Sequence, residues 1–149
     1  MGVNPALSNR SRCSIIGLNI NHKKNDIPRA VLEGIIFESK LVTDILEKTG
    51  VRIKEVRATE GCAKSIKWLQ LKANILNKKI VILKVKDCGL MGAIIIASTG
   101  INRYGSIEEA ISDSVEIENV FLPEIYKNIY PALLPIYEDT YYQDHGEYN

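Results

Sequence analysis

Hydrophobic positions in the first half of the chain change between helical and strand spacing. Apolar residues recur every three or four positions from Ile27 to Leu46, which predicts a long helix. Asn25 or Asp26 can cap its start, and Gly50 can end it. The following residues, 51–58, alternate apolar and charged side chains, as a strand with one exposed face does. Upstream, residues 13–18 predict a short strand or an extended entry.

The same succession is repeated in the next segment. Residues 65–76 form a second amphipathic helix pattern, and residues 79–85 contain the uninterrupted apolar run 80–83. Such a run is typical of a strand covered on both faces, as strands of parallel sheets are. Residues 87–97 open with glycines and continue as a wholly apolar helix. Because no polar face is left for water, we expect this helix to be buried.

The last third is helical by the same criteria. Ser106 and Glu109 match a capping box that opens a short helix. Residues 123–142 are rich in tyrosine and interrupted by Pro131 and Pro135, which predicts one or two kinked helical segments. Their tyrosines have two interpretations, packing against the body or a stacking surface for bases or sugars, and packing is favoured. These tyrosines are Tyr126, Tyr130, Tyr137, Tyr141 and Tyr142.

These elements predict an α/β fold that is incomplete by itself. Two parallel strands flanked by helices leave an open sheet edge and apolar faces without partners. We therefore expect part of a larger sheet domain, divided into a flexible leader at 1–12, a partial α/β domain at 13–122 and a helical tail at 123–149 with a disordered end.

Composition narrows the classes of function. The 149 residues carry a net charge of +1, which gives no argument for a nucleic acid or an anionic membrane as partner. The amino terminus lacks the pattern of a secretory signal and no segment is long enough to span a membrane, so we expect a cytoplasmic protein. The cysteines and histidines are too widely spaced for a disulfide framework, a metal site or nucleophilic catalysis. They are Cys13, Cys62, Cys88, His22 and His145.

The segment with the clearest chemical meaning is the loop at 58–65. It contains mainly small residues, and it lies between the predicted strand 51–58 and the predicted helix 65–76. Small side chains let a ligand approach the backbone, and the first turn of a helix offers unpaired N–H groups to a polar or anionic group. A nucleotide would bind there.

Four ordered motifs resemble a known family. Gly17-Leu18 followed after seven residues by the segment 26–34 resembles the second signature of the FGGY carbohydrate kinases, a branch of the actin-like ATPases. Gly61 to Ser65, with Trp68, Gln70 and Ala73, resembles the family's adenosine-binding Gly-Gly-Gly-Ala-Lys-Ser loop and the helix after it. The segment 87–93 is similar to its Glu-Ala-x-x-Leu-Gly-Ala stretch, and 106–110 to the helix after a Gly-x-Gly-x-Tyr turn.

The resemblance implies the carboxy-terminal part of an actin-like, ribonuclease H-like ATPase domain. It implies ATP and Mg²⁺ as cofactors and a sugar or polyol as substrate. Gly61, Cys62 and Ala63 would present backbone to the adenine and ribose, and the Ser65 hydroxyl would hydrogen-bond the base. Gly92 and Ala93 would pack the apolar helix against the sheet. Arg29 and Glu33 would form an ion pair or position the long helix.

Two departures affect the predicted loop. Glu60 stands where the family has the first glycine, and Cys62 replaces another glycine. The Glu60 carboxylate would repel phosphates if it faced the nucleotide, and would cost little if it pointed into solvent. In the later turn, Asn102 replaces the second glycine.

The catalytic machinery of the family is not represented in this sequence. The resemblance places the base, an Asp, and two phosphate loops upstream of where the motifs begin, so no catalytic residue is assigned. The first hypothesis is the ATP-side piece of a carbohydrate kinase that is inactive alone, with a polyol, a ketopentose or an aldonate as substrate. The alternative is a noncatalytic fragment that binds nucleotide weakly or self-associates, for example as a homodimer.

Overall fold

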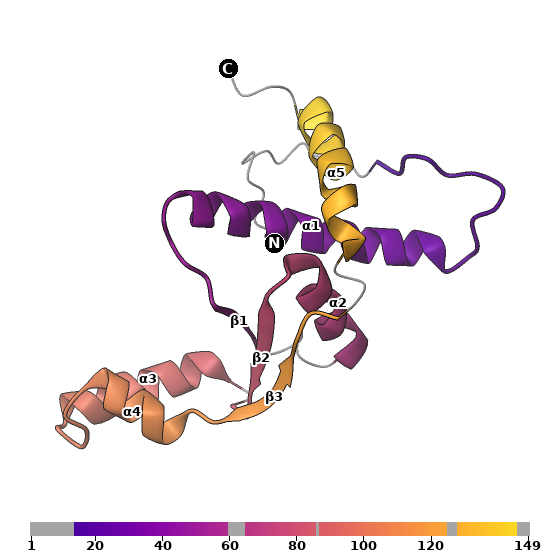
Figure 1. Cartoon of the computed structure of the whole chain (residues 1–149). Helices are drawn as coiled ribbons and strands as arrows, with labels where there is room; N and C mark the ends of the chain where they lie inside the picture. Colours follow the sequence, from indigo (N-terminus) through magenta and orange to yellow (C-terminus); the bar gives the residue numbers. More distant parts are fainter. Residues whose placement is uncertain (1–13, 60–64, 86, 125–127, 146–149) are drawn as a thin grey trace. The chain divides into compact units, whose positions relative to one another are not determined.

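The structure is a computed structural model that describes residues 14–59, 65–85, 87–124 and 128–145. Five helices and three strands lie in these residues (Figure 1). The helices are α1 (Asp26–Lys48), α2 (Ile66–Leu76), α3 (Cys88–Gly100), α4 (Ile107–Ser114) and α5 (Tyr130–His145). The strands are β1 (Glu55–Ala58), β2 (Lys79–Leu83) and β3 (Ile117–Phe121). The predicted leader 1–12 and the end of the tail lie outside the described residues, so those boundaries stay predictions.

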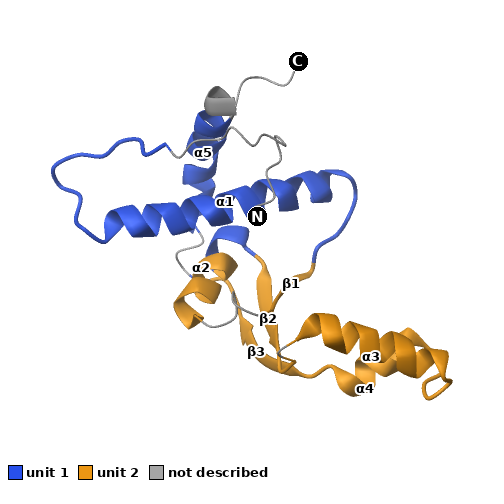
Figure 2. Ribbon diagram, turned by 180° about the vertical axis from the view of Figure 1, so that it is seen from behind, with its two compact units in different colours: residues 1–53, 74–77, 124–149 blue, residues 54–73, 78–123 orange. Residues whose placement is uncertain are grey.

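The chain forms two compact units (Figure 2). One comprises residues 1–53, 74–77 and 124–149, and the other comprises residues 54–73 and 78–123. The first unit contains α1, α5 and the last residues of α2. The second contains the sheet, most of α2, and the α3–α4 pair.

The sheet of the second unit has the order β1-β2-β3. β1 and β2 are parallel, as expected, with Glu55 opposite Lys79 and Ala58 opposite Ile82. The central β2 is buried along Ile80–Ile82, which explains its continuous apolar run. Lys79 Nζ lies 2.7 Å from Glu55 Oε2 across the two strands. This hydrogen bond, followed by that of Arg57, lowers the pKa of Glu55.

The third strand was not predicted. β3 pairs antiparallel with β2 and so covers the β2 side of the predicted two-stranded sheet. It is mostly exposed, with only Phe121 buried. On this strand the Val120 N–H donates to the Asn119 side-chain oxygen over 2.8 Å. Among the described residues, β1 has a strand neighbour only on the β2 side.

The first unit is held together by contacts between α1 and α5. Phe37 of α1 lies edge-on to Tyr130, with ring centroids 6.1 Å apart, and stacks on Tyr137 at 5.2 Å. Tyr137 in turn stacks on Tyr141 at 6.1 Å. Three of the tail tyrosines therefore serve packing, the interpretation favoured from the sequence. The tail is one helix that accommodates Pro135 in its interior.

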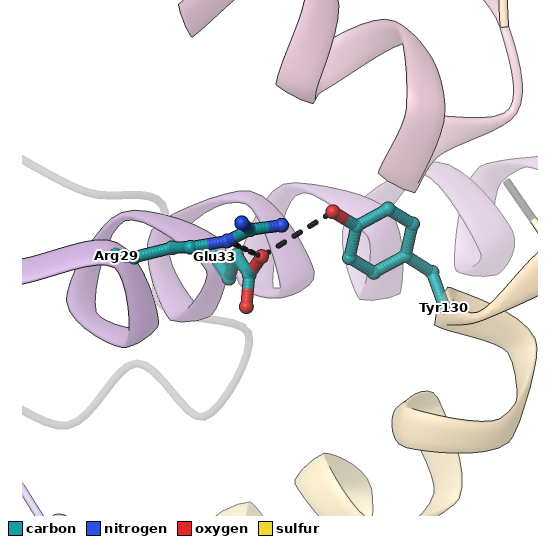
Figure 3. A network of polar contacts seen from close by, with 3 residues as sticks. All are labelled: Arg29, Glu33 and Tyr130. Carbon is teal, nitrogen blue, oxygen red and sulfur yellow. Dashed lines mark hydrogen bonds and ion pairs between the residues drawn. The ribbon is translucent and has the colours of Figure 1, made fainter. Parts of the chain in front are cut away.

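A polar network joins the same two helices (Figure 3). Arg29 Nε donates to Glu33 Oε1 over 2.9 Å, which confirms the ion pair expected on α1. The Tyr130 hydroxyl donates to the same carboxylate oxygen over 3.3 Å. Burial raises the pKa of Tyr130, so the phenol keeps the proton that it donates.

The α3–α4 pair forms a helical hairpin in the second unit (Figure 1). Its turn contains Asn102 in the left-handed region, at φ 56°, where the family has glycine. The Tyr104 hydroxyl donates to Asp113 over 2.6 Å. Ser106 caps α4 by accepting the Glu109 N–H over 3.1 Å, while the Glu109 carboxylate accepts the Gly105 N–H over 2.8 Å. The predicted capping box is thus present, with the reciprocal bond moved by one residue.

The expected burial of α3 was wrong for this chain. Ile95 is the only one of its described residues that is buried. A set of apolar side chains at i, i+3, i+4, i+7 and i+11 is exposed, and we call it the α3 stripe. It comprises Leu90, Ala93, Ile94, Ala97 and Ile101. The packing role implied for Gly92 and Ala93 is also not fulfilled by the described residues, since a Cβ at Gly92 would meet nothing within 4 Å.

Candidate nucleotide site

The carboxyl ends of β1 and β2 bring two predicted segments to the same end of the sheet. We call this carboxyl end the edge, as distinct from the lateral sides formed by β1 and β3. Because Ala58 pairs with Ile82 in a parallel ladder, both strands end on the same side. The small-residue loop follows β1, and the start of α3 follows β2. Ligands of open parallel sheets bind outside the carboxyl ends of the strands. The edge is therefore a candidate binding site.

Among the predicted nucleotide-binding residues of the loop, Ser65 is the one that the structure describes. Gly61, Cys62, Ala63 and Glu60 lie outside the described residues. Ser65 is exposed at the start of α2, where its carbonyl oxygen accepts the Leu69 N–H over 3.0 Å. Its hydroxyl accepts the Trp68 N–H at 3.4 Å. Because Ser65 is exposed and its hydroxyl serves only as acceptor in this bond, the O–H can donate to a second partner.

The other motif residues of α2 make contacts along the helix and with the end of β3. Gln70 Nε2 donates to the Leu122 carbonyl over 2.8 Å, which ties α2 to the end of β3. Lys72 Nζ lies 5.3 Å from the centre of the Trp68 ring, a cation–π contact on the helix surface. Ala73 is fully buried. The Gln70 bond and the burial of Ala73 hold in place the helix that begins next to Ser65.

Asp87 begins α3 at the same edge. Its carboxylate accepts the Leu90 N–H over 2.8 Å and so acts as the N-cap of the helix. A Cβ at Gly89 would lie 3.4 Å from the Asp87 carboxylate oxygen, so the glycine leaves room for the cap. The structure thus gives Asp87 a capping role.

An ion pair between Lys84 and Glu116 was missed by the sequence analysis. Lys84 follows β2 and Glu116 precedes β3, and their side chains pair in addition to the backbone bond from the Lys84 N–H to the Glu116 carbonyl, 2.9 Å. Glu116 raises the pKa of Lys84, and Lys84 lowers the pKa of Glu116. The alternation of apolar and acidic residues at 115–118 was the available signal for β3.

Potential metal ligands are dispersed in the part of the chain that the structure describes. No three of its His, Cys, Asp and Glu residues could hold one ion. These residues do not fit a protein-built Mg²⁺ site. His22 lies in a turn where its Nδ1 accepts the Asn19 N–H over 3.0 Å, and Cys88 is half-buried as a free thiol. None of the described helices is long and apolar enough to cross a lipid bilayer.

Comparisons with known proteins identify the family of this chain. Residues 2–101 match the model of the FGGY family of carbohydrate kinases, C-terminal domain. A xylulose kinase of Staphylococcus epidermidis is 34% identical over 134 residues, which are 87% of this chain and 27% of that protein. Glycerol kinase 2 of Saccharolobus solfataricus is 32% identical over 118 residues, or 78% of this chain and 23% of that protein. The crystal structure of gluconate kinase from Lactobacillus acidophilus superposes with a TM-score of 0.89 and 29% identity, over 97% of this chain and 29% of that one.

The fold is thus the carboxy-terminal part of an actin-like ATPase domain of the kind found in sugar kinases. The chain belongs to the FGGY family of carbohydrate kinases. It spans about a quarter of the length of the curated relatives that it matches, 27% and 23%.

Proposed function

We propose that this chain is the ATP-binding side of an ATP-dependent carbohydrate kinase and works together with the polypeptide that precedes this domain in its relatives. The observation that carries the proposal is the shared sheet edge. There the adenosine-loop motif follows β1 and the capped start of α3 follows the parallel neighbour β2. The family membership supports ATP as the ligand at this edge.

The roles at the edge follow from the side chains present. Gly61, Cys62 and Ala63 present backbone to the adenosine, since their small side chains allow close approach. Ser65 has an exposed hydroxyl at the amino end of α2 and hydrogen-bonds the base. The neighbouring Ile66 is 69% exposed and offers apolar surface beside it. The described residues offer a hydroxyl and apolar surface to a nucleoside, but no group of three metal-binding side chains to Mg²⁺. We therefore expect Mg²⁺ to bind together with the phosphates of ATP.

The same proposal covers the substrate, the partners and the cellular location of the protein. The relatives act on xylulose, glycerol or gluconate, as their names state, so a ketopentose, a polyol and an aldonate are the candidate substrates. The base and phosphate-binding groups come from the preceding polypeptide, and this chain supplies no catalytic residue. We place the protein in the cytoplasm, without a nucleic acid or a membrane as partner.

Titration of ATP with Mg²⁺ into the purified chain by calorimetry tests the proposal. We expect saturable binding that is lost in Gly61→Asp, because the added carboxylate fills the space for adenosine and repels phosphate. Gly100→Asp is the matched control. It adds the same group at the far end of α3, about 18 Å along the helix from its amino end. Absence of binding by the folded wild-type chain would contradict the proposal.

A second candidate function is a noncatalytic fragment that self-associates. It is favoured by the exposed α3 stripe, since uncovered apolar surface promotes association. Sedimentation of the chain over a range of concentrations tests it, and a homodimer without affinity for ATP is the result that would support it.

A further inference from the structure

The α3 stripe is the clearest uncovered surface of the second unit. Leu90, Ile94 and Ile101 expose 60%, 50% and 76% of their surface. Ala93 and Ala97 lie exposed between them. The chain carries no charged residue from Cys88 to Asn102. Contiguous apolar surface of this kind marks a place where another polypeptide packs, because free protein surfaces are normally interspersed with charges.

The stripe is presented by a hairpin that is already formed. α3 packs on α4, where Ile95 and Ala110 are the buried residues of the two helices. The turn between the helices is closed by the bond from Tyr104 to Asp113 and by the Ser106 cap of α4. A partner that packs on the stripe therefore does not have to order the hairpin first, which lowers the entropic cost of association.

The size of the relatives indicates what covers the stripe. The fold of gluconate kinase superposes on 97% of this chain, yet these residues are only 29% of that protein. The matched family domain is the C-terminal one, so the additional length in the relatives precedes it. Each relative therefore carries a large preceding polypeptide that is available to cover the equivalent hairpin. A second copy of this chain is the competing occupant.

We propose that the α3 stripe is the docking surface for the polypeptide that precedes this domain in FGGY kinases, whether that polypeptide is joined to this chain or separate from it. The inference rests on the proposed function, because it takes the occupant from the kinase family. It goes further by assigning the contact to Leu90, Ile94 and Ile101, with the two alanines between them.

Thiol labelling of Ala97→Cys tests the inference. The probe partner is the part of the Staphylococcus epidermidis xylulose kinase that precedes its matched region, fused in front of this chain. Labelling by a small maleimide is followed residue by residue with mass spectrometry, so the native cysteines do not interfere. We expect labelling in the fusion to be at least about tenfold slower than in the isolated chain, as for other sites that react only after local opening.

Ala132→Cys is the matched control, because Ala132 is also an exposed helical alanine and lies on α5. Its labelling should be the same in the fusion and in the isolated chain. Equal labelling of Ala97→Cys in both proteins would overturn the inference. Protection that grows with the concentration of the isolated chain would also overturn it, because a second copy would then be the occupant.

Two further measurements keep the outcome decisive. If the fusion is insoluble, the two pieces are co-expressed as separate chains and labelled in the same way. In either format, Ile94→Asp should lower the melting temperature of the assembled protein and leave that of the isolated chain unchanged. The matched Ile136→Asp, at a residue that is 61% exposed on α5, should lower neither.

ATP titration of the same fusion separates this inference from the proposed function. If the stripe is protected but ATP does not bind, the docking inference stands and the proposed kinase function is contradicted. If ATP binds but the stripe is not protected, the proposed kinase function stands and the docking inference is contradicted.

Discussion

The α1–α5 pair and the α3–α4 hairpin are both pairs of packed helices, but they use their apolar side chains differently. In the α1–α5 pair, Phe37 and the tail tyrosines bury their rings against one another, and Tyr130 bonds Glu33 at the junction. In the hairpin, polar bonds close the turn while the α3 stripe remains in water. The first pair buries aromatic rings within this chain, although α1 also exposes apolar side chains such as Ile35 and Ile45, at 51% and 46%. For the α3 stripe, by contrast, the proposed cover is the polypeptide that precedes this domain. The comparison separates residues that stabilise this chain from residues available to a partner.

Truncation of Phe37 should give the largest effect on stability. Phe37 is 6% exposed and contacts two tyrosine rings, so Phe37→Ala leaves a cavity in the α1–α5 pair. We expect the free energy of unfolding to fall by about 3–5 kcal/mol in urea denaturation. Ile94→Ala on the exposed stripe should change it by less than about 0.5 kcal/mol. Similar losses in both variants would contradict the distinction between the two helix pairs.

Alkaline pH should weaken the α1–α5 pair specifically. Burial raises the pKa of Tyr137 to about 12, compared with about 10 in an unfolded chain. Between these values the unfolded chain has lost the Tyr137 proton and the folded chain has kept it. Unfolding then releases a proton, so stability falls as pH rises. The contribution is complete below about pH 10 and is lost as pH passes about 12.

Urea unfolding at a series of pH values measures this dependence. Tyr137→Phe should remove part of the fall above about pH 10, because the variant has no phenol to titrate. Leu90→Ala on the α3 stripe should keep the full fall. If Tyr137→Phe kept it as well, the titration would have to be assigned to another group.

The hydroxyl of Tyr130 should contribute less than its ring. Tyr130→Phe retains the contact with Phe37 and removes the 3.3 Å bond to Glu33, while Arg29 still pairs with that carboxylate. We expect a loss of about 1 kcal/mol in urea denaturation. Tyr104→Phe removes an exposed bond in the hairpin and should cost less than about 0.5 kcal/mol. The reverse order would show that the hairpin turn is the more critical junction.

Gly92→Ala should give the smallest effect, and its sign distinguishes the free hairpin from a covered one. A Cβ at Gly92 meets nothing within 4 Å, so replacing a helical glycine should stabilise the isolated chain by about 0.5–1 kcal/mol. In the fusion with the kinase polypeptide, a packed neighbour should remove this gain. Thermal unfolding of both proteins, with and without the substitution, measures the difference. A loss of stability in the isolated chain would contradict the open surroundings of Gly92.

Local patterns predicted most of the elements. The run 80–83 led to β2, and the capping box at Ser106 led to α4, because the responsible side chains are neighbours in the sequence. β3 was missed because it is short, mostly exposed and weakly patterned. Its pairing with β2 is decided by contacts between distant residues, such as Lys84 with Glu116.

The sequence assigned the nucleotide to the loop at 58–65 and gave the start of α3 only a packing role, and the assignment of the loop stays a prediction. That both segments follow neighbouring strands at one edge could not be predicted, because it depends on the parallel pairing of β1 and β2. The capping roles of Asp87 and Ser65 follow from local helix chemistry. The exposure of α3 could not be predicted, because burial of an apolar helix depends on what surrounds it and not on its own residues.

The hydrogen bond from the Val120 N–H to Asn119 indicates on which side the sheet can be extended by another strand. A main-chain donor that is bound by a neighbouring side chain is not available to an incoming strand, so the β3 side is poorly suited to extension. On the β1 side, the described residues contain no strand neighbour. Any strand that lengthens this sheet should therefore join beside β1, which makes the assembly of the complete domain a one-sided process.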